Sequence, residues 1–234
     1  MIPIELSQVK KLPQGIPVIV VPFREQLVQK RGEQLKKFTT HMKRWHPDWP
    51  ILIIEQSDDG KKINLGALKN IGARYAQKMA AKYVIFHDVD LIPLSPIVPF
   101  YTAFPEQPLH IGGIYKGKYS NQGDSFLGQA VSISLKDVKT INGYPNTFWG
   151  WGGEDDAIRK RIKKNSIKIW RPTIDTGYKA LDHVESQKIP ELVNNNKWKN
   201  YDTDTGKHGF NDVKWKVLAE EKDKNVIKYT VLLV

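Results

Sequence analysis

Short apolar runs alternate with longer segments of helical periodicity in the first third of the chain. Continuous runs of β-branched residues, typical of strands buried on both faces, occupy residues 17–23, 51–55 and 83–90. Between them, apolar residues recur at roughly helical spacing over 25–45 and 65–79. This β-α-β-α-β order predicts an α/β fold with parallel strands joined by right-handed crossovers.

Charged residues follow two of these strands. Ligands of parallel sheets bind beyond the carboxyl ends of the strands, where Arg24, Asp88 and Asp90 are expected. Asp88 and Asp90 alternate along an extended chain and so point the same way, whereas Val89 points into the core. Two such carboxylates can hold a hard divalent cation, which can neutralise a diphosphate. A solvated acidic turn that caps the next helix is the alternative interpretation.

Composition narrows the class of protein. The 234 residues, 40% of them hydrophobic, suit a single compact domain. Lys and Arg outnumber Asp and Glu by 36 to 25, which favours an anionic partner such as a nucleotide. The lysines are scattered rather than gathered in a basic arm, so we do not expect a nucleic-acid partner. The absence of cysteine favours a reducing compartment. No segment has the length of a signal peptide's apolar run or of a membrane span.

The stretch FWGWGGEDDA, residues 148–157, interleaves tryptophans, glycines and acids. Glycine lets the backbone turn tightly and approach a ligand, and this stretch has three: Gly150, Gly152 and Gly153. Trp149 and Trp151 offer flat apolar faces of the kind on which sugar rings pack. We therefore expect a carbohydrate-binding turn here.

Three consecutive acids, Glu154, Asp155 and Asp156, lead from this turn into AIRKRIKK, a predicted basic helix. The positive N-terminal end of a helix favours carboxylates, so capping accounts for one of the acids. Capping does not account for three acids beside two tryptophans. A carboxylate in this position can also take the proton that a sugar hydroxyl loses in a transition state.

Six segments resemble the β-1,4-galactosyltransferase family, in that family's order and from residue 17 onward: VVPFRE, NLGALKNIG, FHDVDLIP, TINGYPNTFWGWGGEDD, RPTIDTGYKALDH and HGFNDVKWKVL. WGWGGEDD with an upstream DVD is the most specific part. HDVDLIPL and TGYKALDH lean towards the xylosylprotein galactosyltransferase branch, which builds the proteoglycan linker. The resemblance implies a GT-A fold with a mixed, mostly parallel central sheet flanked by helices. It also implies a Mn²⁺ cofactor, with Mg²⁺ as an alternative, and inverting transfer from a UDP-sugar to a glycan hydroxyl, most simply the 4-OH.

The family's roles transfer where residues match. The resemblance implies that Asp155 is the general base and that Asp90 and His183 bind the metal. Glu185 stands where related members have a second histidine as a further ligand, and its hard carboxylate oxygen can serve Mn²⁺ or Mg²⁺ in that place. It implies nucleotide contacts from Pro22, Phe23, Arg24, Ile63, Asp88 and Val89. It implies contacts to the donor and acceptor sugars from Trp151, Gly152, Gly153, Glu154, Asp156, Phe126, Gly128 and Gln129.

Three departures from the family pattern bear on the donor. Leu65 stands where the family often has an arginine, Gln129 where it has a second glycine, and Phe126 where it has a tyrosine. Galactose is the first expectation, with UDP-GalNAc, UDP-GlcNAc and UDP-glucose as alternative donors. A non-catalytic module that binds glycans or polyanions is the alternative from another class.

The order of the six family-like segments suggests that one catalytic domain has three consecutive parts. We expect an N-terminal extension over 1–16, a nucleotide-binding half over 17–93 and a sugar-binding half over 94–234. The polar, aperiodic stretch 184–207 is expected to be a lid over the donor, anchored by Trp198, or else a disordered surface loop. The animal enzymes are Golgi-anchored and contain cysteine, so we expect a cytoplasmic enzyme of a microbe or virus. The oligomeric state is left open.

Overall fold

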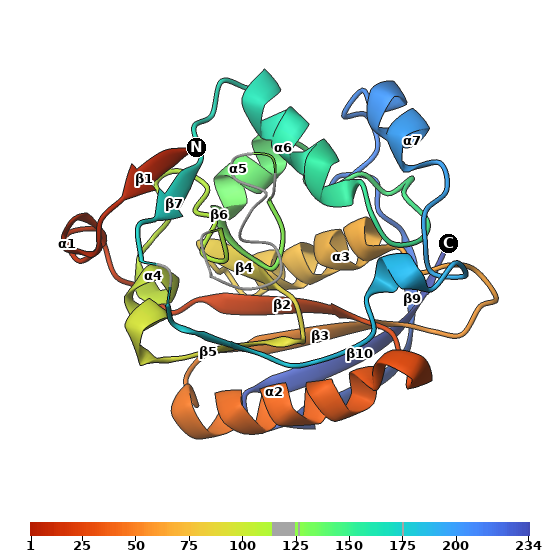
Figure 1. The fold of residues 1–234 in the computed structure, drawn as a ribbon, viewed down its shortest axis with the longest axis horizontal. Coiled ribbons are helices and arrows are strands. Elements are labelled where there is room, and N and C mark those ends of the chain that lie inside the picture. The colour runs from red at the N-terminus through yellow and green to blue at the C-terminus, as the bar shows by residue number, and fades with distance from the viewer. Residues whose placement is uncertain (114–124, 126, 175) are drawn as a thin grey trace.

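A six-stranded sheet forms the centre of the molecule (Figure 1). The computed structural model describes residues 1–113, 125, 127–174 and 176–234. The strand order is β6-β4-β2-β3-β10-β9, with bounds β2 Val18–Phe23, β3 Ile51–Gln56, β4 Tyr83–His87, β6 Ala130–Ser134, β9 Trp215–Asp223 and β10 Val226–Leu233. The four inner strands run parallel and the two outer strands antiparallel to them. The predicted mixed, mostly parallel sheet is confirmed.

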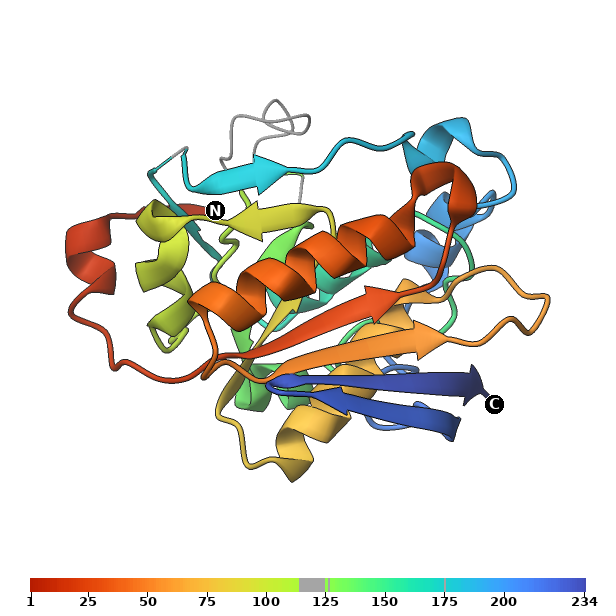
Figure 2. The same cartoon turned by 90° about the horizontal axis from the view of Figure 1, so that it is seen from below.

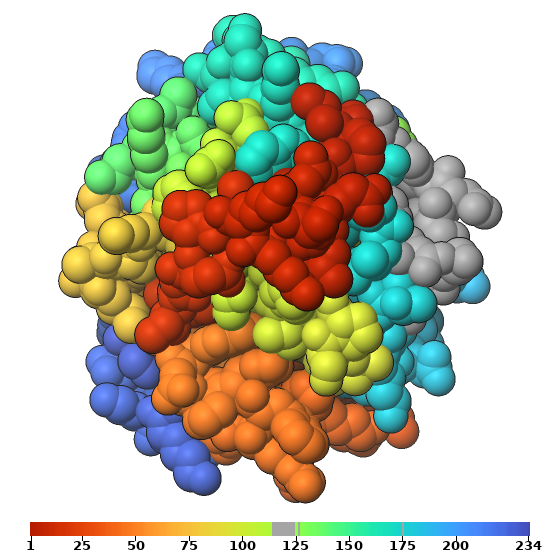
Figure 3. All heavy atoms as spheres, turned by 90° about the vertical axis from the view of Figure 1, so that its left-hand side faces the viewer, coloured from red at the N-terminus to blue at the C-terminus, as the bar shows by residue number. Residues whose placement is uncertain are grey.

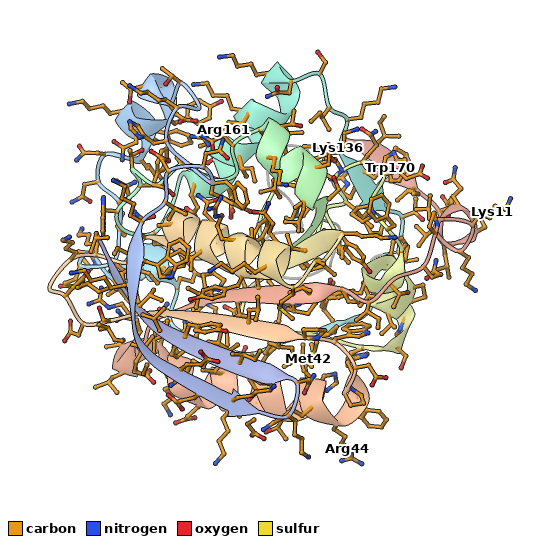
Figure 4. All side chains as sticks on the ribbon, turned by 180° about the vertical axis from the view of Figure 1, so that it is seen from behind. Lys11, Met42, Arg44, Lys136, Arg161 and Trp170 are labelled. Atoms are coloured by element: carbon orange, nitrogen blue, oxygen red, sulfur yellow. The ribbon has the colours of Figure 1, made fainter. Side chains whose placement is uncertain are left out.

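Helices cover both faces of this sheet. On one face lies α2 (Arg31–Trp45), which crosses in front of the strands in Figure 2. Met42 points from this helix towards the sheet in Figure 4 and is fully buried. On the other face lies α3 (Leu65–Lys78), where a Cβ at Gly72 would be only 2.1 Å from a methyl group of Val20. The close approach of α3 to β2 therefore requires a glycine.

The predicted elements are present with shifted ends. The helix expected over 25–45 begins at Arg31, because Lys30 has a left-handed φ of 54° and interrupts it. The preceding residues form a short 3₁₀ helix, η1 (Leu27–Gln29), whose Leu27 is 84% exposed. The strand expected over 83–90 ends at His87. The two aspartates that follow β4 therefore lie in a turn at its carboxyl end.

Shorter elements surround the sheet. They are β1 Ile2–Ile4, α1 Leu6–Val9, β5 Leu91–Pro93, η2 Ser95–Ile97, α4 Val98–Thr102, α5 Leu135–Thr140, α6 Glu154–Lys164, β7 Trp170–Pro172, β8 Tyr178–Ala180, η4 Ser186–Lys188 and α7 Lys197–Thr203. Two small sheets join β1 to β7 and β5 to β8. Within the described residues, no helix has the length and apolar character needed to cross a membrane.

The first sixteen residues pack onto the rest of the domain. β1 pairs in parallel with β7, and Ile4 and Val9 are buried in the core on the α2 side of the sheet. In Figure 3 this segment, in red, lies across one end of the molecule and covers part of α4. The segment expected as an extension is thus a structural part of the domain.

Candidate active site

Three adjoining cavities open at the carboxyl ends of the parallel strands, and Asp88 and Trp151 line all three. The first, which we call the nucleotide cavity, is lined by all six residues predicted to contact the nucleotide: Pro22, Phe23, Arg24, Ile63, Asp88 and Val89. The second, the metal cavity, contains Asp90, His183 and Gln129. The third, the sugar cavity, has a volume of about 470 Å³ and contains the three consecutive acids. Most of the predicted site therefore comes together from segments distant in sequence.

Arg24 lies at the end of β2 and lines the nucleotide cavity. Its guanidinium donates hydrogen bonds to the carboxylate of Asp58, at 2.8 Å, and to the backbone carbonyl of Lys61. These partners belong to the loop between β3 and α3, so one cation holds two sides of the cavity together. A positive charge in this position suits a phosphate group.

Asp88 lies partly buried where β4 ends. Its backbone N–H donates a 2.8 Å hydrogen bond to the carbonyl of Gln129 and ties the acidic turn to the start of β6. Burial, and then the neighbouring Asp90 carboxylate, raises the pKa of Asp88 to about 7. This carboxyl group is therefore held in a site that favours a nearby positive charge.

Asp90 and His183 are brought together by the pairing of β5 with β8. Leu91 pairs with Ala180 in this small sheet, and the N–H of Leu181 donates a 2.7 Å hydrogen bond to the carbonyl of Asp90. As a result, Nδ1 of His183 lies 3.3 Å from Oδ2 of Asp90. A carboxylate oxygen beside an imidazole nitrogen is a donor pair that Mn²⁺ accepts.

The position of Arg31 indicates whether the surroundings of Asp90 favour a positive charge. Its Nη1 lies 2.9 Å from Oδ2 of Asp90, and both side chains are largely buried. The surroundings of the Asp90 carboxylate thus accept a positive group, and with His183 it supplies two donors of kinds that a divalent ion accepts.

Glu185 lies outside this pair. Its carboxylate accepts a hydrogen bond from Nε2 of Gln187 and lies 3.9 Å from Nζ of Lys188. In the part of the chain that the structure describes, no three His, Cys, Asp or Glu side chains are grouped closely enough to hold a metal ion. The role of Glu185 as a ligand stays a prediction, and further ligands would have to come from elsewhere, such as a bound diphosphate.

The glycines of WGWGG have the backbone conformations that the sequence predicts. The φ angles of Gly150, Gly152 and Gly153 are 94°, 107° and 93°, in the left-handed region that favours glycine. This backbone turns Trp151 into all three cavities. Trp149 instead packs against the core on the α3 side of the sheet, away from these cavities. One of the two tryptophans therefore faces the sugar site.

The three acids occupy the first turn of α6 and line the sugar cavity. Asp155 also lines the nucleotide cavity, so it borders both. Burial, and then Asp155, raises the pKa of Glu154 to about 7. The same two causes raise the pKa of Asp156, against the opposing charges of Arg159 and Lys197.

Gln129 is the residue by which the sugar site departs from the family pattern. Its side chain lines both the metal cavity and the sugar cavity, and its φ is +65°. Gly128 precedes it, and its carbonyl oxygen lies 2.9 Å from Nε2 of the buried His110. Phe126, the third predicted determinant of donor choice, lies outside the described residues.

The segment expected as a lid has defined structure. Residues 184–207 contain η4 and α7 and pack on the WGWGG turn, with the N–H of Trp151 2.6 Å from the carbonyl of Leu192. Trp198 is 58% exposed, so it is not a buried anchor. Together with Lys197 and Tyr201 of the same helix, it lines the sugar cavity instead.

Several cations of the site were not identified from the sequence, and Arg31 and Lys69 are two of them. Arg31 lies in a polar stretch whose helix was predicted with the wrong start, so nothing pointed to it. Lys69 lies on α3 with its side chain 4% exposed, and its Nζ is 3.0 Å from Oδ1 of Asp155. A charged residue amid the small and apolar residues of ALKNIGA was the signal that could have found it.

Two family models match the chain. The model described as the N-terminal region of glycosyl transferase group 7 covers residues 12–101. The model described as the N-terminal domain of galactosyltransferase covers residues 109–184. Between them they include nearly every predicted site residue.

Individual proteins with sequences similar to this chain are also galactosyltransferases. Xylosylprotein 4-beta-galactosyltransferase of Caenorhabditis elegans is 34% identical over 160 residues, which are 65% of this chain and 52% of the relative. Beta-1,4-galactosyltransferase 7 of Homo sapiens is 33% identical over 176 residues, 71% of this chain and 50% of the relative. The chain thus spans about half the length of these relatives.

A solved structure covers more of the chain. Drosophila beta-1,4-galactosyltransferase 7, in a mutant form complexed with manganese, UDP-Gal and xylobiose, superimposes with a TM-score of 0.77 at 27% identity. The match covers 94% of both chains. The GT-A arrangement expected from the sequence is therefore confirmed for nearly the whole domain.

Proposed function

Because the chain belongs to the β-1,4-galactosyltransferase family, we propose that it transfers galactose from UDP-galactose to a hydroxyl group of an acceptor sugar, with inversion at the anomeric carbon. The observation that supports this proposal is the position of Asp155. Asp155 and Glu154 both line the nucleotide cavity and the sugar cavity, but the side chain of Glu154 is 6% exposed and that of Asp155 is 28% exposed. Asp155 is therefore the acid of this pair that an acceptor hydroxyl can reach, as a general base requires.

Each residue of the site has a separate role in the proposed reaction. Asp155 takes the proton of the acceptor hydroxyl as its oxygen bonds to the anomeric carbon of the donor, and the bond from that carbon to the phosphate oxygen breaks. The proton ends on Asp155 and the electron pair leaves with UDP. Trp151 gives the sugars an apolar face, and Asp156, at the rim of the same cavity, accepts a hydrogen bond from an acceptor hydroxyl.

Asp90 and His183 are the residues that would hold the divalent ion. That ion, when bound, supplies positive charge to the diphosphate leaving group. The donor pair described above and the manganese in the Drosophila homologue both support this assignment. Arg24 adds a positive charge to the lining of the nucleotide cavity.

The relatives support a xylose-containing acceptor. The Caenorhabditis relative is a xylosylprotein galactosyltransferase, and the Drosophila structure holds xylobiose. A second donor class has a specific observation in its favour, because Gln129 puts a side chain into the sugar cavity. We therefore include UDP-GalNAc, UDP-GlcNAc and UDP-glucose in the test.

The test measures UDP release from UDP-galactose with Mn²⁺ and a β-xyloside, on the wild type and on Asp155→Asn. The amide keeps the size of the side chain but cannot take the proton, so we expect kcat to fall roughly 10²–10⁴-fold. Asp223→Asn is the matched control, since Asp223 forms an exposed ion pair with Lys43 far from the cavities.

Release that requires metal, acceptor and Asp155 would support the proposal. A donor other than UDP-galactose turned over more than tenfold faster would replace galactose. Absence of turnover with every donor, together with glycan binding that Asp155→Asn leaves intact, would mean that the domain is a non-catalytic binding module.

A further inference from the structure

Lys69 is a buried cation beneath the proposed base. It projects from the part of α3 in which every residue from Gly66 to Ala73 is buried. Its Nζ lies 3.0 Å from Oδ1 of Asp155 and 3.7 Å from Oε1 of Glu154, and 4.4 Å from the centre of the Tyr144 ring. The side chain is 4% exposed, so water contributes little to its charge balance.

The contacts of Lys69 keep it charged. Burial alone would lower the pKa of a lysine, but Asp155, Tyr144, Glu154 and Asp88 raise it well above the usual value. A buried ammonium that lost these carboxylates would cost several kcal/mol. Lys69 is therefore a permanent positive charge whose position depends on the acids above it.

The acids depend equally on Lys69. Four carboxylates, Asp88, Glu154, Asp155 and Asp156, border the sugar cavity. Arg31 acts on Asp88 from α2, while Arg159 and Lys197 act on Asp156 from α6 and α7. Among the residues that the structure describes, Lys69 is the cation within 4 Å of both Glu154 and Asp155.

Lys69 contacts Asp155 through one carboxylate oxygen, Oδ1, while Asp155 lines both the nucleotide cavity and the sugar cavity. A general base must be held within hydrogen-bond reach of the proton it takes. A base on the first turn of a helix, supported by a buried ion pair, meets this requirement better than a freely rotating one.

We infer that Lys69 is a positioning residue for the transfer reaction: its buried ammonium holds Asp155 and Glu154 as a pair of carboxylates and turns one oxygen of Asp155 towards the acceptor hydroxyl. The inference rests on the proposed function. It adds a residue of α3 to the acids at the start of α6.

The test is the pH profile of kcat/KM for UDP release, measured with UDP-galactose, Mn²⁺ and a β-xyloside on the wild type, Lys69→Met and Lys69→Gln. Both variants are neutral, and the glutamine keeps a hydrogen-bond donor. Loss of a positive charge disfavours the ionised forms of the carboxylates that it contacts. We therefore expect the acid limb of the profile to move to higher pH, with kcat at pH 7 falling at least tenfold.

Two further variants are needed. One separates the effect of the position of the ammonium group from the effect of its charge, and the other separates both from a general loss of stability. Lys69→Arg keeps the charge but moves it, so the acid limb should stay in place while kcat falls. Lys228→Met is the matched control, because Lys228 also lies between two carboxylates, 2.8 Å from Glu221 and 3.4 Å from Glu55, outside the three cavities. It should leave both the acid limb and kcat at the wild-type values.

The outcomes distinguish this inference from the function on which it rests. A wild type without metal-dependent UDP release means that the proposed function is wrong. An active wild type whose acid limb is the same in a folded neutral variant overturns the role of Lys69 alone. If neither neutral variant folds, an unchanged kcat in Lys69→Arg overturns it.

Discussion

The backbone of Gln129 is left-handed at the point where the side chain enters the sugar cavity. A φ of +65° costs a residue with a Cβ roughly 1–2 kcal/mol relative to glycine. The β-1,4-galactosyltransferases have a glycine at the corresponding place, so this chain bears a conformational cost that the family pattern avoids. Gln129 also lines the sugar cavity, so we expect its side chain to fill part of the donor-sugar site.

Replacement of this residue tests that role. We expect Gln129→Gly to raise the free energy of unfolding by about 1 kcal/mol, because the strain is relieved. It should also open the sugar cavity and raise the ratio of turnover with UDP-GalNAc to turnover with UDP-galactose. Urea unfolding and a panel of UDP-sugars measure the two effects.

A second left-handed residue provides the control. Lys224, with a φ of 56°, lies in the exposed turn between β9 and β10. Lys224→Gly should gain a similar stability and leave donor preference unchanged. If Gln129→Gly behaves the same way, its side chain does not select the donor.

At the scale of elements, the residue that directly follows α2 is a histidine that folding keeps neutral. The ring of His46 stacks on Trp49 at a centroid distance of 4.0 Å. Burial, and then the nearby His41, lowers the pKa of His46 to about 4. In the unfolded chain the pKa of a histidine is about 6.5. The unfolded state therefore binds a proton that the folded state does not take up until the pH is much lower.

This difference predicts a loss of stability in acid. The contribution of neutral His46 is complete above about pH 6.5 and is lost as the pH falls towards 4. His46→Phe keeps an aromatic ring on Trp49 but cannot be protonated. The free energy of unfolding, measured with urea from pH 7 to pH 4, should fall less steeply in this variant than in the wild type. Parallel curves would mean that His46 does not contribute to acid sensitivity.

The elements that the sequence predicted are those with apolar periodicity. The three parallel strands and α3 were identifiable because continuous apolar runs and a buried helical face are strong local signals. The start of α2 was not, since the left-handed Lys30 moves it to Arg31 through backbone conformation alone. Helix α7 was missed because none of its residues is buried, so it has no apolar face to detect.

The same distinction applies to the site. The acids and glycines of WGWGGEDD are contiguous, so their grouping was visible in the sequence. Lys69 acts on Asp155 across 86 positions, and Arg31 acts on Asp90 across 59. Such partners are determined by how the elements pack, which local patterns do not encode. The site could therefore be predicted for its acids but not for the cations that hold them.

At the scale of the whole molecule, the site exists only in the folded chain. The nucleotide cavity combines the end of β2, the turn after β4, the start of α6 and the segment containing Leu192. A ligand that needs all four binds the folded state and not the unfolded one, so its binding free energy adds to the stability of the domain.

This linkage predicts a shift in melting temperature that is independent of turnover. At one hundred times their dissociation constant, Mn²⁺ and UDP together should add about 2.7 kcal/mol, or about 5–10 °C for a domain of this size. Asp90→Asn should lose the metal-dependent part and keep a smaller effect of UDP, whereas Asp223→Asn should respond like the wild type. A shift that Asp90→Asn retains in full would place the metal elsewhere. The measurement thus tests the metal site before any donor or acceptor is identified.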